Sequence, residues 1–183
     1  MKRYTSANGN SKEMKIKPYV PADFNEIKTW VTDERTHALW CGGLIPYPLN
    51  KNDFEKTLKE FIVKNGDSPF VATTNKGKII GFFCYSTNPD TGEGKLKFII
   101  ISPQFRNKGY GKEMVTLALK HAFCNSSAES VQLNVFLNNG PAKNCYLHVG
   151  FSIRSITKKS FCFNEEMWSK CNMVIKKHQL LDI

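Results

Sequence analysis

The chain has 183 residues, of which 41% are hydrophobic and 23% charged, as is typical of one globular domain with a buried core. No apolar run approaches the roughly 20 residues that a membrane-spanning helix needs, so we expect no membrane protein. The net charge of +10 would suit nucleic acid, but the lysines and arginines are spread through the chain. Because no nucleic-acid-binding motif stands out, nucleic-acid binding is only a secondary hypothesis.

The six cysteines form no C-x-x-C pair and show no metal-ligand spacing with the four histidines. We therefore expect neither a metal site nor a disulfide framework. The start of the chain is basic and lacks the apolar segment of a signal peptide, so we expect a flexible leader at 1–14 and one domain at 15–183. Free thiols and the missing signal favour the cytoplasm. The sequence leaves open whether the protein is a monomer or a homodimer.

The first third of the chain reads as one strand followed by helices. Phe24, Ile27 and Val31 recur at helical spacing, and Phe54, Leu58, Phe61 and Ile62 mark a further helix that Asn65 and Gly66 end. The predicted strand covers 15–20, and the predicted helices cover 21–31, 33–40 and about 52–65. The loop at 41–50 is rich in glycine and proline but carries apolar residues, so we expect it to pack against the domain or to line a pocket.

The rest of the chain alternates between strands and helices. A hairpin is predicted at 70–85, and three isoleucines at the end of the strand 95–101 indicate burial on both faces. A helix to Phe123 and a strand at 131–137 follow, and such a crossover makes the two strands parallel. The remaining predicted elements are a helix from Pro141 to Gly150 and strands at 151–159 and 168–176.

A strand, a short basic loop and the start of a helix follow one another between residues 99 and 112. Gly109 and Gly111 remove side chains from the turn, so its backbone can bend tightly and approach a ligand closely. The first turn of a helix offers unpaired N–H groups and a partial positive charge, to which Arg106, Lys108 and Lys112 add full charges. This combination favours an anion, and a pyrophosphate fits it best.

Two familiar phosphate-binding motifs do not fit these residues. A dinucleotide-binding fingerprint needs a third glycine three residues after Gly111, where the chain has Met114. A Walker loop needs a glycine where Arg106 stands and a serine or threonine where Glu113 stands. An ordinary basic turn between a strand and a helix remains the alternative.

Two segments resemble motifs of the GCN5-related N-acetyltransferase (GNAT) superfamily. Arg106-x-x-Gly109-x-Gly111 is similar to its Q/R-x-x-G-x-G/A signature. Further along the chain, every fixed position of its N-x-x-A-x-x-x-Y-x-x-x-G-F pattern is filled, by Asn139, Ala142, Tyr146, Gly150 and Phe151. The resemblance is specific between residues 96 and 151 and extends loosely over 15–177.

The resemblance implies a single α/β domain with a mixed, mostly antiparallel sheet of about seven strands, a central parallel pair and flanking helices. It also implies an acetyl-CoA site between the parallel strands. Pantetheine would pair with the backbone of Ile99 and Ile101, and the backbone of 107–112 would hold the pyrophosphate. The implied coenzyme-binding residues are Ile99, Ile100, Ile101, Arg106, Asn107, Lys108, Gly109, Tyr110, Gly111, Lys112 and, toward the pantetheine arm, Asn139.

Tyr146 takes the superfamily's role of general acid toward the leaving thiolate. A thiol resembling cysteine has a pKa near 8.5, so its thiolate is already a fair leaving group, and an acid adds about 10²-fold. The alternative role is core packing, because Ala142, Cys145, Tyr146 and Val149 share one helical face. Catalysis is the interpretation that we favour.

No general base is evident. An acceptor amine resembling lysine has a pKa of about 10.4, so a base or a water chain must take its proton before attack. Two branches of the superfamily place a glutamate where this chain has Lys95 and Asn134, and neither residue can replace it. Glu93 precedes Lys95 by two residues, but a solvated turn residue is the simpler interpretation. A base that acts through water remains open.

The acceptor pocket is the least defined part of the site. Trp30, His37, Trp40 and Tyr47 could form one wall, although these aromatic side chains could equally belong to the core. Glu165 and Glu166 could attract a cationic amine, or they could lie in a solvated loop. His37 as a base is a minor hypothesis. The sequence does not choose between a ribosomal protein, an aminoglycoside, a polyamine and an amino acid as acceptor.

The resemblance therefore implies an enzyme that transfers an acetyl group from acetyl-CoA to a primary amine of a small molecule or protein. Direct attack in a ternary complex needs no covalent enzyme intermediate, and no cysteine has a recognisable nucleophile context. The rival hypothesis is a non-catalytic, regulatory acyl-CoA-binding module. The missing glutamates favour the rival, whereas Tyr146 and Asn139 favour the enzyme.

Overall fold

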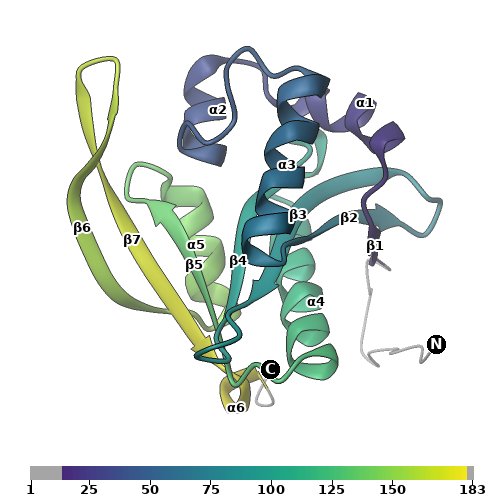
Figure 1. Ribbon diagram of the computed structural model, residues 1–183, viewed down its shortest axis with the longest axis vertical. Helices are drawn as coiled ribbons and strands as arrows, with labels where there is room; N and C mark the ends of the chain where they lie inside the picture. Colours follow the sequence, from purple (N-terminus) through teal and green to yellow (C-terminus); the bar gives the residue numbers. More distant parts are fainter. Residues whose placement is uncertain (1–13, 181–183) are drawn as a thin grey trace.

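The computed structural model describes residues 14–180, which form one seven-stranded sheet with helices on both faces (Figure 1). The strands are β1 (Met14–Pro18), β2 (Ser68–Thr74), β3 (Ile79–Thr87), β4 (Gly94–Ile101), β5 (Ser130–Phe136), β6 (Ser152–Phe163) and β7 (Glu166–Lys176). The α-helices are α1 (Phe24–Ile27), α2 (Glu34–Cys41), α3 (Lys51–Asn65), α4 (Tyr110–Asn125), α5 (Gly140–Val149) and α6 (Lys177–Leu180). Short 3-10 helices cover Pro21–Asp23, Lys28–Trp30 and Pro103–Phe105.

The strand order is β1-β2-β3-β4-β5-β7-β6. Within residues 14–180, β4 and β5 are the only parallel neighbours, and α4 is the crossover between them. Strand β7 lies between β5 and β6, so the last hairpin joins the sheet through its second strand. The predicted mixed, mostly antiparallel sheet with a central parallel pair is confirmed.

Some element boundaries differ from the sequence-based expectation. The helix expected at 21–31 consists of α1 flanked by 3-10 turns, and Val31 ends it in an extended conformation. Strand β6 extends beyond the expected range. It is an exposed edge strand, so its sequence carries little apolar alternation from which its full length could be predicted. Met14, which we expected to be the last residue of the leader, begins β1. Residues 1–13 lie outside the described part of the chain.

Capping residues at the helix ends explain why α2 and α3 begin and stop where they do. The carboxylate of Asp33 accepts a hydrogen bond from the backbone N–H of Thr36 at 2.8 Å, and Asn50 caps α3 in the same way. Gly42 and Gly66 end the two helices with φ angles of 59° and 67°, which a glycine adopts without steric cost.

Apolar side chains are buried on both faces of the sheet. Helices α4 and α5 pack on one face, where Met114 and Leu119 are fully buried, and helices α1–α3 pack on the other, around Phe54. Strand β4 contributes to both clusters, since Leu96 lies in the first and Ile100 in the second. This arrangement confirms that β4 is a central strand.

Strands β4 and β5 pair over only a short length and then separate. Their register joins Gly94–Leu96 to Val131–Leu133. Opposite β3, a bulge interrupts β4 between Lys97 and Ile100, and Phe98 adopts a φ of 52°. The indole N–H of Trp40 on α2 donates a 2.8 Å hydrogen bond to the Phe98 carbonyl and braces the irregular segment. Beyond Leu96, therefore, the β5-facing edge of β4 has no strand partner among the described residues.

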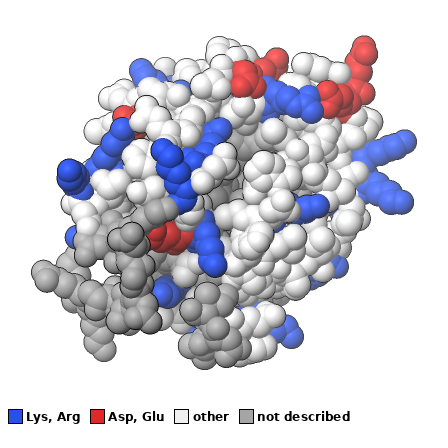
Figure 2. Space-filling view, turned by 180° about the vertical axis from the view of Figure 1, so that it is seen from behind, with Lys and Arg blue, Asp and Glu red and all other residues white. Residues whose placement is uncertain are grey.

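The surface shows no single basic patch on the face that carries α4 and α5. Figure 2 shows this face from behind, with Lys and Arg side chains in several separate groups and uncharged surface between them. Among residues 14–180, no helix is both long and apolar enough to cross a membrane.

A buried ion pair anchors β4 next to its irregular segment. The ammonium of Lys97 lies 2.5 and 2.8 Å from the carboxylate oxygens of Asp67, the residue before β2. The Asp67 side chain is only 1% exposed and that of Lys97 13%. The ammonium also lies 5.2 Å from the centre of the Phe61 ring, a cation–π contact. A charge this far from water needs its partner.

We predict that Asp67→Asn lowers the free energy of unfolding by about 3 kcal/mol, because it leaves the Lys97 ammonium buried without an opposite charge. The double variant Asp67→Leu/Lys97→Met should recover most of that loss, since it removes both charges. Urea denaturation followed by circular dichroism measures both effects. A single variant within about 0.5 kcal/mol of the parent protein would contradict the importance of the pair.

Candidate active site

The separation of β4 and β5 leaves a cleft on the sheet. Its walls come from α2, from β4 and β5, and from the start and middle of α5. The residues that line it are Leu39, Trp40, Leu96, Lys97, Phe98, Ile99, Asn134, Val135, Asn139 and Tyr146. Tyr146, Asn139 and Ile99, which the sequence places in the site, therefore come together here, whereas the Ile100 side chain faces the α1–α3 core.

The glycine loop, residues 106–111, follows β4 after the short 3-10 helix Pro103–Phe105. Asn107 and Gly109 have φ angles of 57° and 82°, so the chain turns sharply before α4 begins at Tyr110. A Cβ atom added at Gly111 would lie 3.5 Å from Cys145 Sγ and 3.8 Å from Ile101 Cγ1, so the free protein has room there for a methyl group. The exposed loop leads into the first turn of α4, whose unpaired backbone N–H groups are the feature on which the expected anion site depends.

Two of the basic side chains in this loop point back at the protein backbone. Arg106 donates from Nε to the Ile101 carbonyl at 3.0 Å and from Nη2 to the Trp30 carbonyl at 3.5 Å. Lys108 donates to the Gln104 carbonyl at 2.8 Å. Burial lowers the pKa of Arg106. In this conformation Arg106 braces the loop against β4 and is not turned toward an anion.

Tyr146 is buried within α5 and lies at the wall of the cleft. The residue is 6% exposed, and its ring packs edge-on against Phe151 with 6.0 Å between the ring centres. Desolvation raises the pKa of its hydroxyl, with a smaller contribution from Cys145. The hydroxyl is therefore protonated at neutral pH, and the residue that carries it lines the cleft. Packing and donation, the two roles weighed from the sequence, both fit this position.

Asn139 has a structural task in addition to its place at the cleft. Its side-chain oxygen accepts a hydrogen bond from the backbone N–H of Ala142 at 3.3 Å, so it caps α5. The amide nitrogen of Asn139 remains available as a donor. The cap fixes the first turn of the helix that carries Tyr146.

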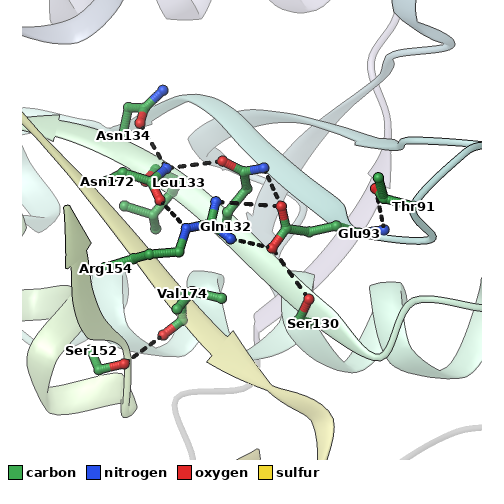
Figure 3. A network of polar contacts seen from close by, with 10 residues as sticks. All are labelled: Thr91, Glu93, Ser130, Gln132, Leu133, Asn134, Ser152, Arg154, Asn172 and Val174. Atoms are coloured by element: carbon green, nitrogen blue, oxygen red, sulfur yellow. Dashed lines mark hydrogen bonds and ion pairs between the residues drawn. The ribbon is translucent and has the colours of Figure 1, made fainter.

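Glu93 is neither a solvated turn residue nor a base in the cleft. It lies one residue before β4, where β4 and β5 are still paired, and its carboxylate is 2.7 Å from the Arg154 guanidinium. It also accepts hydrogen bonds from Ser130 and Gln132 (Figure 3). The side chain is 19% exposed. The sequence could not reveal this because Arg154 is 61 residues further along the chain.

The expected acceptor wall is only partly present. Trp40 lines the cleft and Tyr47 is 47% exposed, but Trp30 is 1% exposed and belongs to the core. His37 is buried between the rings of Trp40 and Tyr47, and desolvation lowers the pKa of its imidazole. Trp30 therefore cannot contact an acceptor in this structure, and His37 supports the wall from behind.

A clamp between α2 and the tip of the β6–β7 hairpin was missed by sequence reasoning. Arg35 and Glu166 form two parallel hydrogen bonds of 2.7 and 3.0 Å, and Trp168 Nε1 donates to the same carboxylate at 2.9 Å. The hydrogen bond from Arg35, and then that from Trp168, lower the pKa of Glu166 to about 2. Glu166 is thus engaged by a cation of the protein itself, while Glu165 lies in the exposed hairpin turn.

Comparison with known proteins now identifies the family. The model of the acetyltransferase (GNAT) family matches residues 24–151, which is well over half of the chain and includes the cleft, the glycine loop and α5. The chain belongs to the GNAT family. It is an acetyl-CoA-dependent N-acetyltransferase by class.

Solved structures show the same fold. The spermidine N-acetyltransferase from Vibrio cholerae, solved in complex with CoA and spermine, superposes with a TM-score of 0.80, 20% identity and coverage of 94% of this chain and 99% of that one. A chimera of Vibrio cholerae SpeG and hSSAT gives a TM-score of 0.79 at 19% identity, with coverage of 94% of this chain and 100% of the chimera. At such identity, the likeness establishes the fold of this GNAT enzyme.

We predict that Gly111→Val weakens acetyl-CoA binding more than tenfold, because a branched side chain would occupy the space where the pyrophosphate of the coenzyme approaches the turn. Gly111→Ala should have a smaller effect, since the structure accommodates its methyl group without a clash. Isothermal titration calorimetry measures the affinity, and circular dichroism checks the fold.

Gly66→Asn is the control for replacing a glycine elsewhere, because asparagine tolerates the φ of 67° at the end of α3. It should leave the affinity for acetyl-CoA unchanged. A correctly folded Gly111→Val protein that binds acetyl-CoA like the parent would disprove the assignment of the pyrophosphate site.

Proposed function

We propose that this GNAT enzyme acetylates a primary amine by direct attack on acetyl-CoA within the cleft between β4 and β5. The observation that carries the proposal is that Tyr146 lines a cleft whose β4 edge is open and leads toward the glycine loop. None of the described residues that line the cleft is a cysteine or serine, which favours a ternary complex over an acyl-enzyme.

The described residues fit the coenzyme. The unpaired edge of β4 beyond Leu96 offers backbone groups to the pantetheine amides, and the backbone of 107–112 offers N–H groups to the pyrophosphate. Asn139 can donate from its amide nitrogen toward the pantetheine arm. Acetyl-CoA supplies the activated acetyl thioester, and the protein positions it.

Tyr146 assists the departure of the thiolate. As the amine nitrogen forms its bond to the carbonyl carbon, the C–S bond breaks and negative charge develops on sulfur. The buried Tyr146 hydroxyl donates a hydrogen bond or its proton to that sulfur. Because burial raises its pKa, the group is a weak acid, and we expect it to contribute mainly as a hydrogen-bond donor.

Water is the proposed carrier of the acceptor's proton. No carboxylate or histidine is among the described residues that line the cleft. A cationic cleft lowers the pKa of an ammonium group by repulsion and so favours its neutral, nucleophilic form. Lys95, near the start of β4, supplies such a charge, whereas Asp67 balances the charge of Lys97 at the cleft.

The similar structures suggest what kind of group is acetylated. The Vibrio cholerae protein was solved with the amine spermine, and its name describes it as a spermidine N-acetyltransferase. We therefore propose a primary amine on a small molecule as the acceptor. The rival hypothesis, a non-catalytic acyl-CoA-binding module, would bind the coenzyme but release no thiol with any amine.

We also propose a reducing compartment, the cytoplasm, as the place where the enzyme works. All six cysteines are free thiols, and Cys41, Cys84 and Cys171 are buried in the core. Such thiols persist where the cell keeps them reduced.

Tyr146→Phe should lower the turnover rate about ten- to a hundredfold, because it removes the donor to the leaving sulfur while retaining the packed ring. Affinity for acetyl-CoA and thermal stability should hardly change. Single-turnover kinetics with a chemistry-limited amine measure the effect without interference from product release.

Tyr85→Phe is the matched control. Tyr85 is also 6% exposed, but its hydroxyl bonds to Thr87 and Ser126 at 2.9 Å, away from the cleft. This variant should lose about 1 kcal/mol of stability and keep its turnover rate. If Tyr146→Phe instead loses stability at full single-turnover rate, Tyr146 is a core aromatic residue and not the acid.

A further inference from the structure

The cleft adjoins a sheet face that the described helices leave largely open. In Figure 1, most of β5, β7 and β6 has no helix in front of it. Helix α2 approaches this face at the hairpin end, where Arg35 lies over the rings of Phe163 and Trp168. In the β5–β7 register Asn134 is opposite Asn172 and Phe136 is opposite Lys170, and opposite residues share a face. Leu133 and Val135 point to the other face, into the α4–α5 core. Asn134, which lines the cleft, and Lys170 therefore lie on the same open face.

Side-chain amides form a network across this face, and the Glu93–Arg154 ion pair is part of it (Figure 3). Arg154 can only donate, so the atom of Asn172 that lies 2.6 Å from its Nε is the side-chain oxygen. The Glu93 carboxylate accepts, so Gln132 turns its nitrogen to Glu93 and its oxygen to Asn172. The two charges thus fix the orientation of both amides.

This orientation determines what Asn134 presents to the cleft. Asn172 has to donate from its nitrogen, and it does so to the Asn134 oxygen at 2.9 Å. The side-chain amide nitrogen of Asn134 is consequently available to donate to a ligand. Figure 3 shows that nitrogen pointing away from the network. At the position where some relatives carry a glutamate, this chain offers a hydrogen-bond donor.

Lysines add positive charge around that donor. Lys95 and Lys170 form no ion pair among the described residues, and both side chains are partly buried. Lys95 is opposite Gln132 in the β4–β5 register, on the face that carries Asn134. Burial first, and then the charges of Lys97 and Lys170, lower the pKa of Lys95, against smaller opposing contributions from Asp67 and Glu93. An anion bound near Lys95 and Lys170 would offset this repulsion.

The nearby carboxylates are already engaged by cations of the protein. Asp67 pairs with Lys97, Glu93 with Arg154, and Glu166 with Arg35. Glu165, in the hairpin turn, is exposed to solvent. A polycation at this face would meet lysines and an amide donor, and of these four carboxylates only that of Glu165, in the hairpin turn, has no ion pair within residues 14–180.

We propose that the acceptor is a small primary amine that also carries an anionic group, a carboxylate or a phosphate, which Lys95, Lys170 and the Asn134 amide nitrogen bind. The inference rests on the proposed amine acetylation. It departs from the polyamines that the names of the similar structures describe, because the open face of this chain favours an anion over a second ammonium group.

A matched panel of amines tests the proposal. Propylamine, β-alanine and 1,3-diaminopropane present a neutral, an anionic and a cationic end at similar length, while 2-aminoethyl phosphate distinguishes phosphate from carboxylate. Longer ω-amino acids and spermidine extend the panel. Thiol release gives kcat/KM for each amine. We expect the better of the two anionic classes to exceed 1,3-diaminopropane and spermidine at least tenfold. A higher kcat/KM for 1,3-diaminopropane or for spermidine than for the anionic amines would overturn the proposal.

Charge reversal locates the preference on the protein. Lys170→Glu and Lys95→Glu should each reduce the ratio of kcat/KM for the anionic amine to that for 1,3-diaminopropane about tenfold, the equivalent of about 1.4 kcal/mol. Lys76→Glu in the exposed β2–β3 turn changes the net charge equally and should leave the ratio unchanged. An equal change in all three variants would indicate an effect of overall charge and would contradict the site.

A protein that acetylates no amine in the panel would refute the proposed function, and calorimetry then decides the inference separately. β-Alanine and 2-aminoethyl phosphate are titrated into the CoA-saturated protein. Binding that is lost in Lys170→Glu and kept in Lys76→Glu supports an anion site without catalysis. The absence of binding by both ligands overturns it.

Discussion

The early separation of β4 from β5 is the constraint on which the rest of the site depends. Two parallel strands in the middle of a sheet would normally pair along their length and leave no place for a ligand. Here the pairing stops at Leu96 and the strand is irregular at Phe98. The indole N–H of Trp40 donates a hydrogen bond to the Phe98 carbonyl. The open edge then leads into the glycine loop, and α5 brings Tyr146 to the opposite wall. The coenzyme would complete the sheet that the protein leaves incomplete.

Fixed charges hold this open geometry in place. The Lys97–Asp67 pair ties the irregular segment of β4 to the start of β2, and Arg106 ties the loop to Ile101. On the other side of the cleft, Glu93 and Arg154 orient the amides that end at Asn134. Since all these groups are held before a ligand binds, little ordering should be needed when the coenzyme and the acceptor enter. Among the described residues, those that line the cleft include a lysine and amide donors but no carboxylate.

The sequence predicted those features that depend on neighbouring residues. Apolar periodicity gave most strands and helices, and the spacing of Arg106, Gly109 and Gly111 marked the loop, whose backbone turns as expected. Contacts between distant segments were not predictable in this way. Nothing local distinguishes Glu93 from a solvated turn residue, because its partner Arg154 belongs to an edge strand. The burial of Trp30 likewise depends on how the N-terminal helices pack, and the side chain of Arg106 turned to the backbone although the motif suggested an anion ligand. The roles of Tyr146 and Asn139 stay predictions.

Amide hydrogen–deuterium exchange with and without acetyl-CoA tests the central claim most directly, because it reports which backbone groups become paired when the coenzyme binds. The account predicts slower exchange at the β4 amides of residues 97–101 and at the loop amides of 107–112, with β1 and the tip of the β6–β7 hairpin unchanged. Binding of acetyl-CoA that leaves 97–101 and 107–112 unprotected, or that protects another surface instead, would contradict it.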